Sequence, residues 1–299
     1  MAYSQPGIDD GADPNAAASA NVVYVMGAGR SGSTILGILL GNGADLFYAG
    51  ELDAWIRRHG VANGDTPDLA EFWSPVAEEM AEWLECPTPD FFTAFEHPRG
   101  MLAAGTRGRL APRSAYQRYN RRLYAMILRR SGASWVVDSS HFPLRRWNLR
   151  GTEGLEIRTI MLVRDPRTVA AAFRKPVQKP KGFWGAACYL WVVHLLSIAV
   201  YLSIPRRSRL RVRYEDLVAR PGDELLRIGA WLGVDLAGVD PQHLVPGPVF
   251  QGNRMRTQPV VRVERGQLDG DWAGLATSLV MAPWVVMLGY GRRRRRGRA

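Results

Sequence analysis

Short apolar runs recur along the chain at intervals that leave room for a helix between them. The first run, residues 21–26, is rich in β-branched side chains. Runs of this length and composition predict strands that are buried on both faces of a sheet. We predict further strands at 134–140, 156–165 and 209–217.

Segments with helical periodicity separate the apolar runs. The segment 31–43 follows the first run and ends in Gly41-Asn42-Gly43, which is a helix stop signal. The segment 221–233 begins with proline and ends with glycine, as helices commonly do. Alternating strands and helices predict an α/β fold, in which helices flank a central parallel sheet and ligands bind at the carboxyl ends of the strands.

Composition divides the chain into one large domain with two unusual ends. Residues 1–20 are small, polar and acidic, which predicts a disordered leader rather than a signal peptide. We expect one domain over 21–290, with a mostly helical insertion at about 53–131 that carries no clear strand. Residues 291–299 form an arginine-rich tail.

The segment 186–204 allows two interpretations. Its nineteen mostly apolar residues are long enough for a membrane span of about 30 Å at about 1.5 Å per residue. It also contains His194, and it lies between two predicted strands of one sheet. Because a membrane span here would divide that sheet across a bilayer, we favour a buried core helix and keep a single span as the alternative.

The charge of the chain points to anionic partners. The formal charge is +11, but six of the arginines stand in the terminal tail, so the rest of the chain is only moderately basic. No zinc-finger spacing or RNA-binding aromatic motif is present, so we expect no nucleic-acid partner. Cys86 and Cys188 are far apart and have no metal-ligand spacing, which favours a reducing cytoplasm.

The sequence GAGRSGST, from Gly27 to Thr34, has the glycine spacing of a nucleotide-binding P-loop. Ser33 stands where such a loop has lysine, so the bridging cation of a triphosphate site is missing. Arg30 lies inside the turn instead, where its planar guanidinium can bind oxyanions beside the N–H groups of a helix N-terminus. The loop therefore predicts an anion site within a P-loop-containing α/β fold.

This loop resembles the phosphosulfate-binding loop of sulfotransferases that use 3′-phosphoadenylyl sulfate (PAPS). A second block, IMLVRDPRTVAAAF at 160–173, is similar to the 3′-phosphate motif of that family. The likeness continues through 212–233 and 252–256, and covers roughly residues 22–272. The nearest type resembles the bacterial branch related to tyrosylprotein sulfotransferases.

The resemblance implies which residues bind PAPS. Arg164 would hold the 3′-phosphate, and Tyr214 would lie near the nucleotide. The family has a serine where this chain has Ala172, so Arg256, Arg167 or Arg174 would have to supply that contact. The residues that would hold the 5′-phosphosulfate are Gly27, Arg30, Ser31, Gly32, Ser33 and Thr34.

The implied reaction is attack by an acceptor hydroxyl on sulfur, without a metal and with cationic stabilisation of the departing oxygens by Arg30. Glu51 can face Arg30, because a helix leading about 15 Å away is followed by an extended return of about 20 Å. Glu51 matches the catalytic glutamate of the tyrosylprotein branch. His141, in DSSHFP, resembles the catalytic histidine of the cytosolic enzymes. Either residue could be the base, and the other histidines are expected to be structural: His59, His97, His194 and His243.

Two other functions remain open from the sequence. One is a P-loop NTPase or small-molecule kinase, which the missing lysine disfavours. The other is a non-catalytic, membrane-associated binding protein, suggested by 186–204 and by the tail at 291–299, which could contact anionic membranes peripherally. The acceptor stays undetermined: a lipid, glycolipid, sugar, phenol or peptide tyrosine would each provide a hydroxyl.

Overall fold

The computed structural model describes residues 19–60, 67–84, 95–96, 113–174, 182–252, 254–263 and 275–291. The predicted leader lies outside these residues up to position 18, and the predicted tail lies outside them from position 292.

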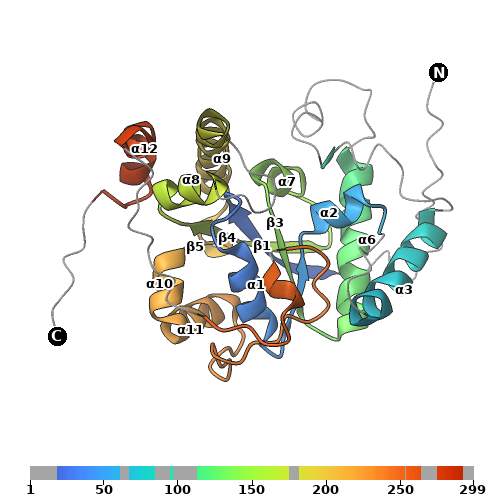
Figure 1. Ribbon diagram of the computed structural model, residues 1–299. Helices are drawn as coiled ribbons and strands as arrows, with labels where there is room; N and C mark the ends of the chain where they lie inside the picture. The colour runs from blue at the N-terminus through green and yellow to red at the C-terminus, as the bar shows by residue number, and fades with distance from the viewer. Residues whose placement is uncertain are drawn as a thin grey trace, which may run out of the picture.

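A five-stranded parallel sheet with the order β2-β3-β1-β4-β5 forms the centre of the molecule (Figure 1). Each neighbouring pair of strands is parallel, as the alternation of strands and helices predicted. The strands are β1 (Ala20–Gly27), β2 (Leu46–Gly50), β3 (Trp135–His141), β4 (Leu155–Val163) and β5 (Arg209–Arg213).

Helices cover both faces of this sheet (Figure 1). The α-helices are α1 (Ser33–Gly41), α2 (Leu52–Arg57), α3 (Pro67–Leu84), α6 (Arg113–Ser131), α7 (Pro143–Asn148), α8 (Pro166–Arg174), α9 (Phe183–Ser203), α10 (Tyr214–Ala219), α11 (Pro221–Leu232) and α12 (Leu275–Met287). The 3₁₀ turns are η1 (Arg206–Ser208) and η2 (Arg254–Thr257).

The central strand β1 is buried on both sides, which explains its unbroken apolar sequence. Val23 and Val25 point into a core formed with α1 and α11. Tyr24 and Met26 point the opposite way, into a core formed with α2, α3 and α6. Successive side chains of a strand alternate between its faces, so a strand between two helical layers must be apolar at every position.

The strand predicted at 209–217 is too long. β5 ends at Arg213, and Tyr214 begins the helix α10. Glu215 and Asp216 occupy the first turn of this helix, where carboxylates are favoured by the helix dipole. The strand predicted at 156–165 likewise ends early, at Val163, so the residues that follow it lie beyond the sheet.

The extended segment expected before Glu51 is the edge strand β2, which pairs with β3. Within 53–131 the described residues form α2, α3 and α6 and the short stretch 95–96. The helices α3 and α6 pack against each other.

The prediction of a buried core helix at 186–204 is correct for one side of α9 and wrong for the other. The helix packs against α7, α8, α12, β1 and β4. The sheet stays continuous, because β4, which precedes α9 in the chain, pairs with β5, which follows it. The opposite side of α9 is exposed, although the helix is long and apolar enough to cross a membrane.

Candidate active site

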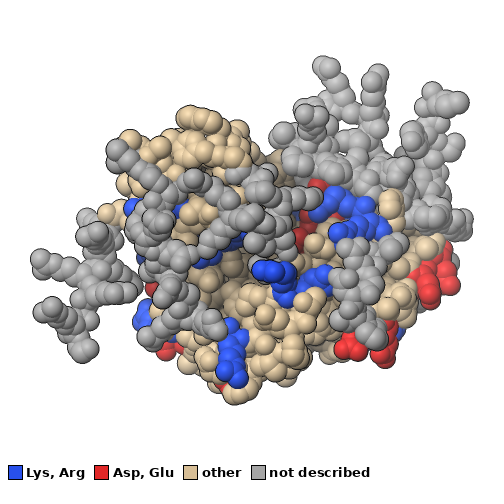
Figure 2. Space-filling view, viewed as in Figure 1, with Lys and Arg blue, Asp and Glu red and all other residues tan. Residues whose placement is uncertain are grey.

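The carboxyl ends of all five strands meet around one cavity of about 680 Å³. The loop 27–34 follows β1, Glu51 follows β2, and His141 ends β3. Arg164 follows β4, and Tyr214 follows β5. Each of these segments lines the cavity, so residues far apart in sequence gather where an open parallel sheet binds its ligands. Figure 2 shows a hollow at the centre of this face with basic side chains around it.

The loop 27–34 turns from β1 directly into α1. The N–H of Ser31 donates to the carbonyl of Ala28 at 3.3 Å, and the first helical bond runs from Leu36 to Gly32 at 3.1 Å. Ser33 and Thr34 therefore occupy the first turn of α1 and line the cavity. Backbone N–H groups at a helix N-terminus attract anions, so this wall of the cavity is suited to a phosphate or sulfate group.

Gly32 is required at its position for two reasons. Its φ angle of 99° lies in the left-handed region, which disfavours side chains with a Cβ. A Cβ added there would also lie 2.3 Å from Cδ2 of Tyr214. The ring of Tyr214 thus packs directly on the loop, and the start of α10 holds the start of α1 in place.

Arg164 connects the end of β4 to the loop. Its Nη1 donates to the carbonyl oxygen of Arg30 at 3.2 Å, and its guanidinium lies 4.2 Å from the ring centroid of Tyr214. Within the described part of the chain, the buried Nε of Arg164 has no hydrogen-bond acceptor. A buried N–H without an acceptor is costly, so this group favours an anionic ligand in the cavity.

Arg30 has a left-handed backbone, with a φ angle of 65°. Its guanidinium lies 5.3 Å from the ring centroid of Phe173 on α8. A non-glycine residue in this conformation is strained, and such strain is common where a side chain must be aimed at a ligand. His141 has the same kind of backbone, with a φ angle of 47°.

Glu51 and His141 stand on neighbouring strand ends and influence each other. Glu51 directly precedes α2, and its side chain makes no capping hydrogen bond to the helix. Burial raises the pKa of the Glu51 carboxyl, and the nearby His141 opposes this rise. The raised pKa places this carboxyl closer to neutrality, where general bases work best.

The ring of His141 is oriented by its own strand. Its Nδ1 lies 3.3 Å from the carbonyl oxygen of Ser139. A carbonyl can only accept, so this contact is a hydrogen bond when Nδ1 carries the proton. The other ring nitrogen, Nε2, faces the loop 27–34. A Cβ added at Gly29 would lie 3.8 Å from it.

A hydrogen-bonded bridge fixes β3 relative to α2. The N–H and the Oγ–H of Ser140 both donate to the Asp138 carboxylate, with 2.8 Å for the N–H. The same Ser140 Oγ accepts the N–H of Asp53 at 3.0 Å. Because Ser140 precedes His141 and Asp53 closely follows Glu51, the bridge sets the positions of both candidate catalytic residues.

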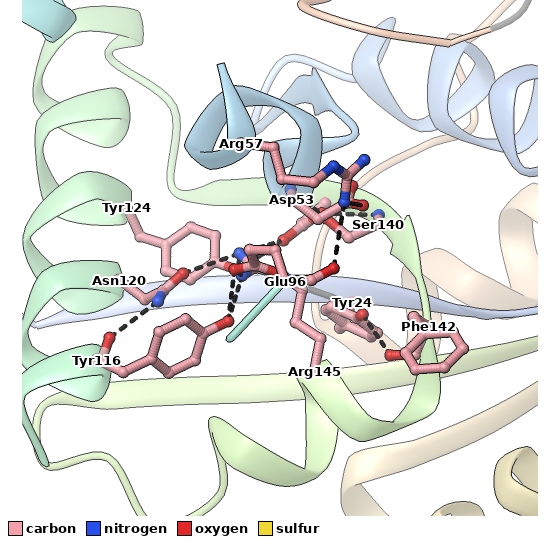
Figure 3. A network of polar contacts seen from close by, with 11 residues as sticks. Tyr24, Asp53, Arg57, Glu96, Tyr116, Asn120, Tyr124, Ser140, Phe142 and Arg145 are labelled. Atoms are coloured by element: carbon pink, nitrogen blue, oxygen red, sulfur yellow. Dashed lines mark hydrogen bonds and ion pairs between the residues drawn. The ribbon is translucent and has the colours of Figure 1, made fainter. Parts of the chain in front are cut away.

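Beneath this bridge lies a buried polar network around Arg145, a residue of α7 with no exposed surface (Figure 3). Its Nη2 donates to Asn120 at 2.8 Å, and it forms ion pairs with Glu96 and Asp138. Burial raises the pKa of Glu96 to about 7, while Arg145 opposes this shift. The network anchors β3 to α6, whose inward face carries Tyr116, Asn120 and Tyr124 at intervals of four residues.

Two tyrosines that sequence reasoning missed join elements around the site. The N–H of Gly29 donates to the hydroxyl of Tyr189 on α9 at 3.0 Å. Tyr48 on β2 shares a hydrogen bond of 3.0 Å with Ser139. A hydroxyl inside the apolar run 186–204 was the available signal for Tyr189, whereas nothing in the sequence marked Tyr48.

Three arginines were expected to replace the serine contact at Ala172. Ala172 does line the cavity, but Arg167 pairs with Asp165, with 2.6 Å between Nη2 and Oδ2. Arg256 lies on η2, whose Met255 lines the cavity while Arg256 does not. The side chain of Arg174 lies outside the described residues.

Arg262, which the sequence did not single out, lines the cavity together with Gln251. No periodicity or motif marks these two positions, because the segment that carries them follows the last strand and enters the site only through tertiary folding.

The other histidines that the structure describes do not line the cavity. His194 is buried in α9, and burial lowers its pKa to about 4. His243 is exposed and lies 2.7 Å from Asp240. His59 follows the end of α2, and His97 lies outside the described residues.

Comparisons with known proteins agree with this architecture. Residues 22–238 match the model of a family described as "Sulfotransferase family". Among solved structures, the sulfotransferase domain of the Synechococcus PCC 7002 olefin synthase has a TM-score of 0.58 and 17% identity, covering 92% of this chain and 97% of that one.

Two further structures are similar. The sulfotransferase domain from the curacin biosynthetic pathway has a TM-score of 0.53 and 16% identity, with 92% of this chain and 100% of that chain covered. Sulfotransferase STF9 from Mycobacterium avium has a TM-score of 0.52 and 14% identity, with 95% of this chain and 79% of that chain covered. At these identities the likeness concerns the fold alone. A sequence comparison with curated proteins found no match.

Proposed function

Because the chain belongs to the sulfotransferase family, we propose that it transfers a sulfuryl group from PAPS to an acceptor hydroxyl and releases 3′-phosphoadenosine 5′-phosphate. The observation that carries the proposal is the placement of Arg30 and Arg164 at one cavity. One guanidinium lies in the loop that opens α1, and the other lies at the end of the adjacent strand β4.

Two features of the cavity support PAPS as the donor. PAPS carries two separate anionic groups, the 5′-phosphosulfate and the 3′-phosphate, so a site for it needs two separate anion-binding regions. The first turn of α1 with Arg30 provides one region. Arg164, whose buried Nε has no acceptor among the described residues, provides the other.

In this assignment the loop orients the donor end of the site. The N–H groups of Ser31 to Thr34 would bind the 5′-phosphosulfate, and Arg164 would bind the 3′-phosphate. Tyr214 would border the nucleotide, because its ring contacts both Gly32 and Arg164. Arg262 lines the cavity and is a further cation that could bind the nucleotide. Arg256 does not line the cavity, and its contact with the nucleotide remains a proposal.

PAPS would supply the activated sulfuryl group, and the chain would move the protons. Glu51 would take the proton of the acceptor hydroxyl, since its raised pKa makes it a stronger base than an exposed carboxylate. His141, with a proton on both ring nitrogens, would donate from Nε2 to the bridging oxygen while its Nδ1–H bonds the carbonyl of Ser139. Arg30 would stabilise the negative charge that develops there.

The acceptor is proposed only as a hydroxyl compound, because the described walls of the cavity show no feature that selects one class. The polar and apolar side chains that line the cavity, among them Gln251, Met255 and Val260, would accommodate an amphipathic molecule. We place the reaction in the cytoplasm, which the low cysteine content supports. The peripheral membrane contact of the arginine-rich tail is part of the same proposal.

The test is incubation of the purified chain with PAPS bearing labelled sulfur and with cell extracts as the source of acceptors. We expect labelled product to form together with an equal amount of 3′-phosphoadenosine 5′-phosphate. Consumption of ATP with Mg²⁺, without any use of PAPS, would instead support an NTPase or kinase. Binding of PAPS without transfer to any acceptor would contradict an enzymatic role.

A further inference from the structure

An apolar stripe runs along the exposed side of α9. The helix contains no Asp, Glu, Lys or Arg from end to end. Its exposed residues recur every three or four positions, which is the spacing of a single helical face. They include large side chains with high exposed fractions, 74% for Trp184, 61% for Leu195 and 64% for Leu202. The exposed stripe consists of Trp184, Cys188, Trp191, Val192, Leu195, Ala199 and Leu202.

A second apolar stripe lies on α12, which packs beside α9. This helix also carries no charged residue, and Leu279, Val286 and Met287 are exposed by 65%, 69% and 56%. Trp191 of the first stripe contacts α12 directly. Its Nε1 donates to the carbonyl of Val280 at 3.2 Å, and its ring lies 5.2 Å from that of Trp284.

The two stripes therefore form one surface, which we call the α9–α12 face. The apolar side chains of this face are neighbours, whereas the exposed apolar residues of a soluble protein are normally scattered singly. In Figure 2 the described surface at the upper left, over α9 and α12, carries no acidic or basic colour.

Arginines follow both helices of this face. Arg206 and Arg207 follow α9 after two intervening residues and are exposed. In the sequence, the five consecutive arginines at 292–296 begin five residues after the end of α12. Neither helix of the face contains an acidic residue. Clustered arginines attract anionic lipid headgroups, and tryptophan prefers the boundary between headgroups and acyl chains.

We propose that the α9–α12 face docks onto the surface of an anionic lipid membrane. The stripes would lie at the level where headgroups meet acyl chains, and the flanking arginines would contact phosphate groups. The helix α9 lies on the surface and does not cross the bilayer, because its inner side, with Leu190, Val193 and Val200, is packed against the sheet domain.

Docking here would bring the candidate active site close to the membrane. Tyr189 on the inner side of α9 accepts the N–H of Gly29 in the loop, while its neighbour Cys188 is exposed on the outer side. Only one layer of helix thus separates the loop from the α9–α12 face. The docking proposal does not depend on the proposed reaction, because it concerns binding alone.

Sedimentation of the full chain with vesicles tests this proposal. Vesicles of phosphatidylcholine alone are compared with vesicles that also contain phosphatidylglycerol. We expect binding to the anionic vesicles. We also expect a loss of about tenfold or more in affinity for Leu195→Asp and for Val286→Asp, since each removes one large apolar side chain from the contact with the membrane. Serine at all six arginines of 292–298 should weaken the preference for anionic vesicles, while Arg206 and Arg207 keep part of it.

The matched control is Leu226→Asp on α11, because Leu226 is also exposed, by 56%, but lies outside the α9–α12 face. It should bind vesicles as the wild type does. Equal losses for Leu226→Asp and Leu195→Asp, or no binding of the wild type to anionic vesicles, would overturn the proposal. A dimer in vesicle-free solution that Leu195→Asp dissociates would show that the face binds a second copy instead.

A direct readout uses Cys188, which lies in the stripe. With Cys86 changed to serine, a polarity-sensitive dye on Cys188 should shift its emission to the blue when anionic vesicles are added. An unchanged emission spectrum under conditions where the protein sediments with vesicles would show that another surface makes the contact.

Discussion

Arg164 donates a hydrogen bond from Nη1 to the backbone carbonyl of Arg30, 3.2 Å away. The residue that directly follows β4 is thereby joined to the loop that follows the neighbouring strand β1. The bond uses only one of the five guanidinium N–H groups, and the buried Nε has no acceptor in the described part of the chain. The rest of the guanidinium remains available to a ligand anion.

Arg164→Ala should remove most of the preference for PAPS over adenylyl sulfate, which lacks the 3′-phosphate. A charge-assisted hydrogen-bonded contact of this kind contributes roughly 2 to 3 kcal/mol, or about 30- to 150-fold in relative affinity. Competition binding with the two nucleotides measures this ratio. Arg220→Ala, at an exposed arginine outside the cavity, is the control. Equal affinity of the wild type for both nucleotides would contradict the assignment.

Gly32→Ala should weaken PAPS binding by at least about tenfold. A side chain in the left-handed region costs about 1 to 2 kcal/mol, and the new Cβ would also collide with the ring of Tyr214. The control is Gly222→Ala on α11, where an added Cβ meets nothing within 4 Å. Calorimetric titration of both variants decides the matter, and unchanged binding in Gly32→Ala would mean that the loop does not contact the nucleotide.

Glu51→Gln should lower turnover by about 10²- to 10⁴-fold while PAPS binding is kept, if Glu51 takes the acceptor proton. The pH profile gives a second readout. A base must be deprotonated, so activity falls as the pH drops through the pKa of Glu51. Because burial raises that pKa, this acid limb should lie above the range of an ordinary carboxyl. A profile that is the same in Glu51→Gln would exclude Glu51 as the base.

His141→Lys and His141→Ala distinguish the two possible roles of His141. As a donor to the bridging oxygen, it can be replaced by a lysine ammonium, so His141→Lys should keep measurable activity and His141→Ala should not. If His141 is the base, lysine cannot replace it, because a protonated lysine accepts no proton, and His141→Lys should be as inactive as His141→Ala. Single-turnover rates at saturating PAPS separate these cases. Near-normal turnover in Glu51→Gln combined with an inactive His141→Lys would show that the roles are reversed.

His194 should make the fold sensitive to acid. Its pKa is lowered to about 4 by burial, whereas an exposed histidine titrates near 6.5. Between these values the unfolded chain binds more protons than the folded chain, so stability present above about pH 6.5 is lost as the pH falls toward about 4. From about pH 7 to about pH 5 this loss is about 2 kcal/mol.

Urea unfolding of the wild type, His194→Phe and His194→Gln at both pH values measures this effect. Both variants remove the titrating group but differ in packing, so each should lose the same part of the pH dependence whatever its overall stability. If the wild type and both variants lost equal stability on acidification, another group would be responsible.

Several features of this protein were readable from the sequence because they depend on local pattern. The apolar run before the glycine-rich loop specifies β1, and the loop itself places a helix N-terminus after it. Proline at 221 and glycine at 233 mark both ends of α11. Residues that follow strands, such as Glu51 and Arg164, reach one cavity because parallel strands all end at the same edge.

Other features depend on contacts between distant segments, which no local pattern records. The end of β5 at Arg213 was missed, because Tyr214 continues the alternation of Leu210 and Val212 into the first residue of α10. The packing of Tyr214 on Gly32 and the bond between Tyr189 and Gly29 join positions more than 150 residues apart.

The two sides of α9 show the same limit most clearly. By sequence α9 is apolar all round, and such a helix is expected to be buried on every side. Only the fold decides that the sheet and its helices cover one side while the other stays exposed next to α12. Hydrophobicity determines that a side chain favours burial, but the area available for burying it is set by how many neighbouring elements the tertiary structure places around it.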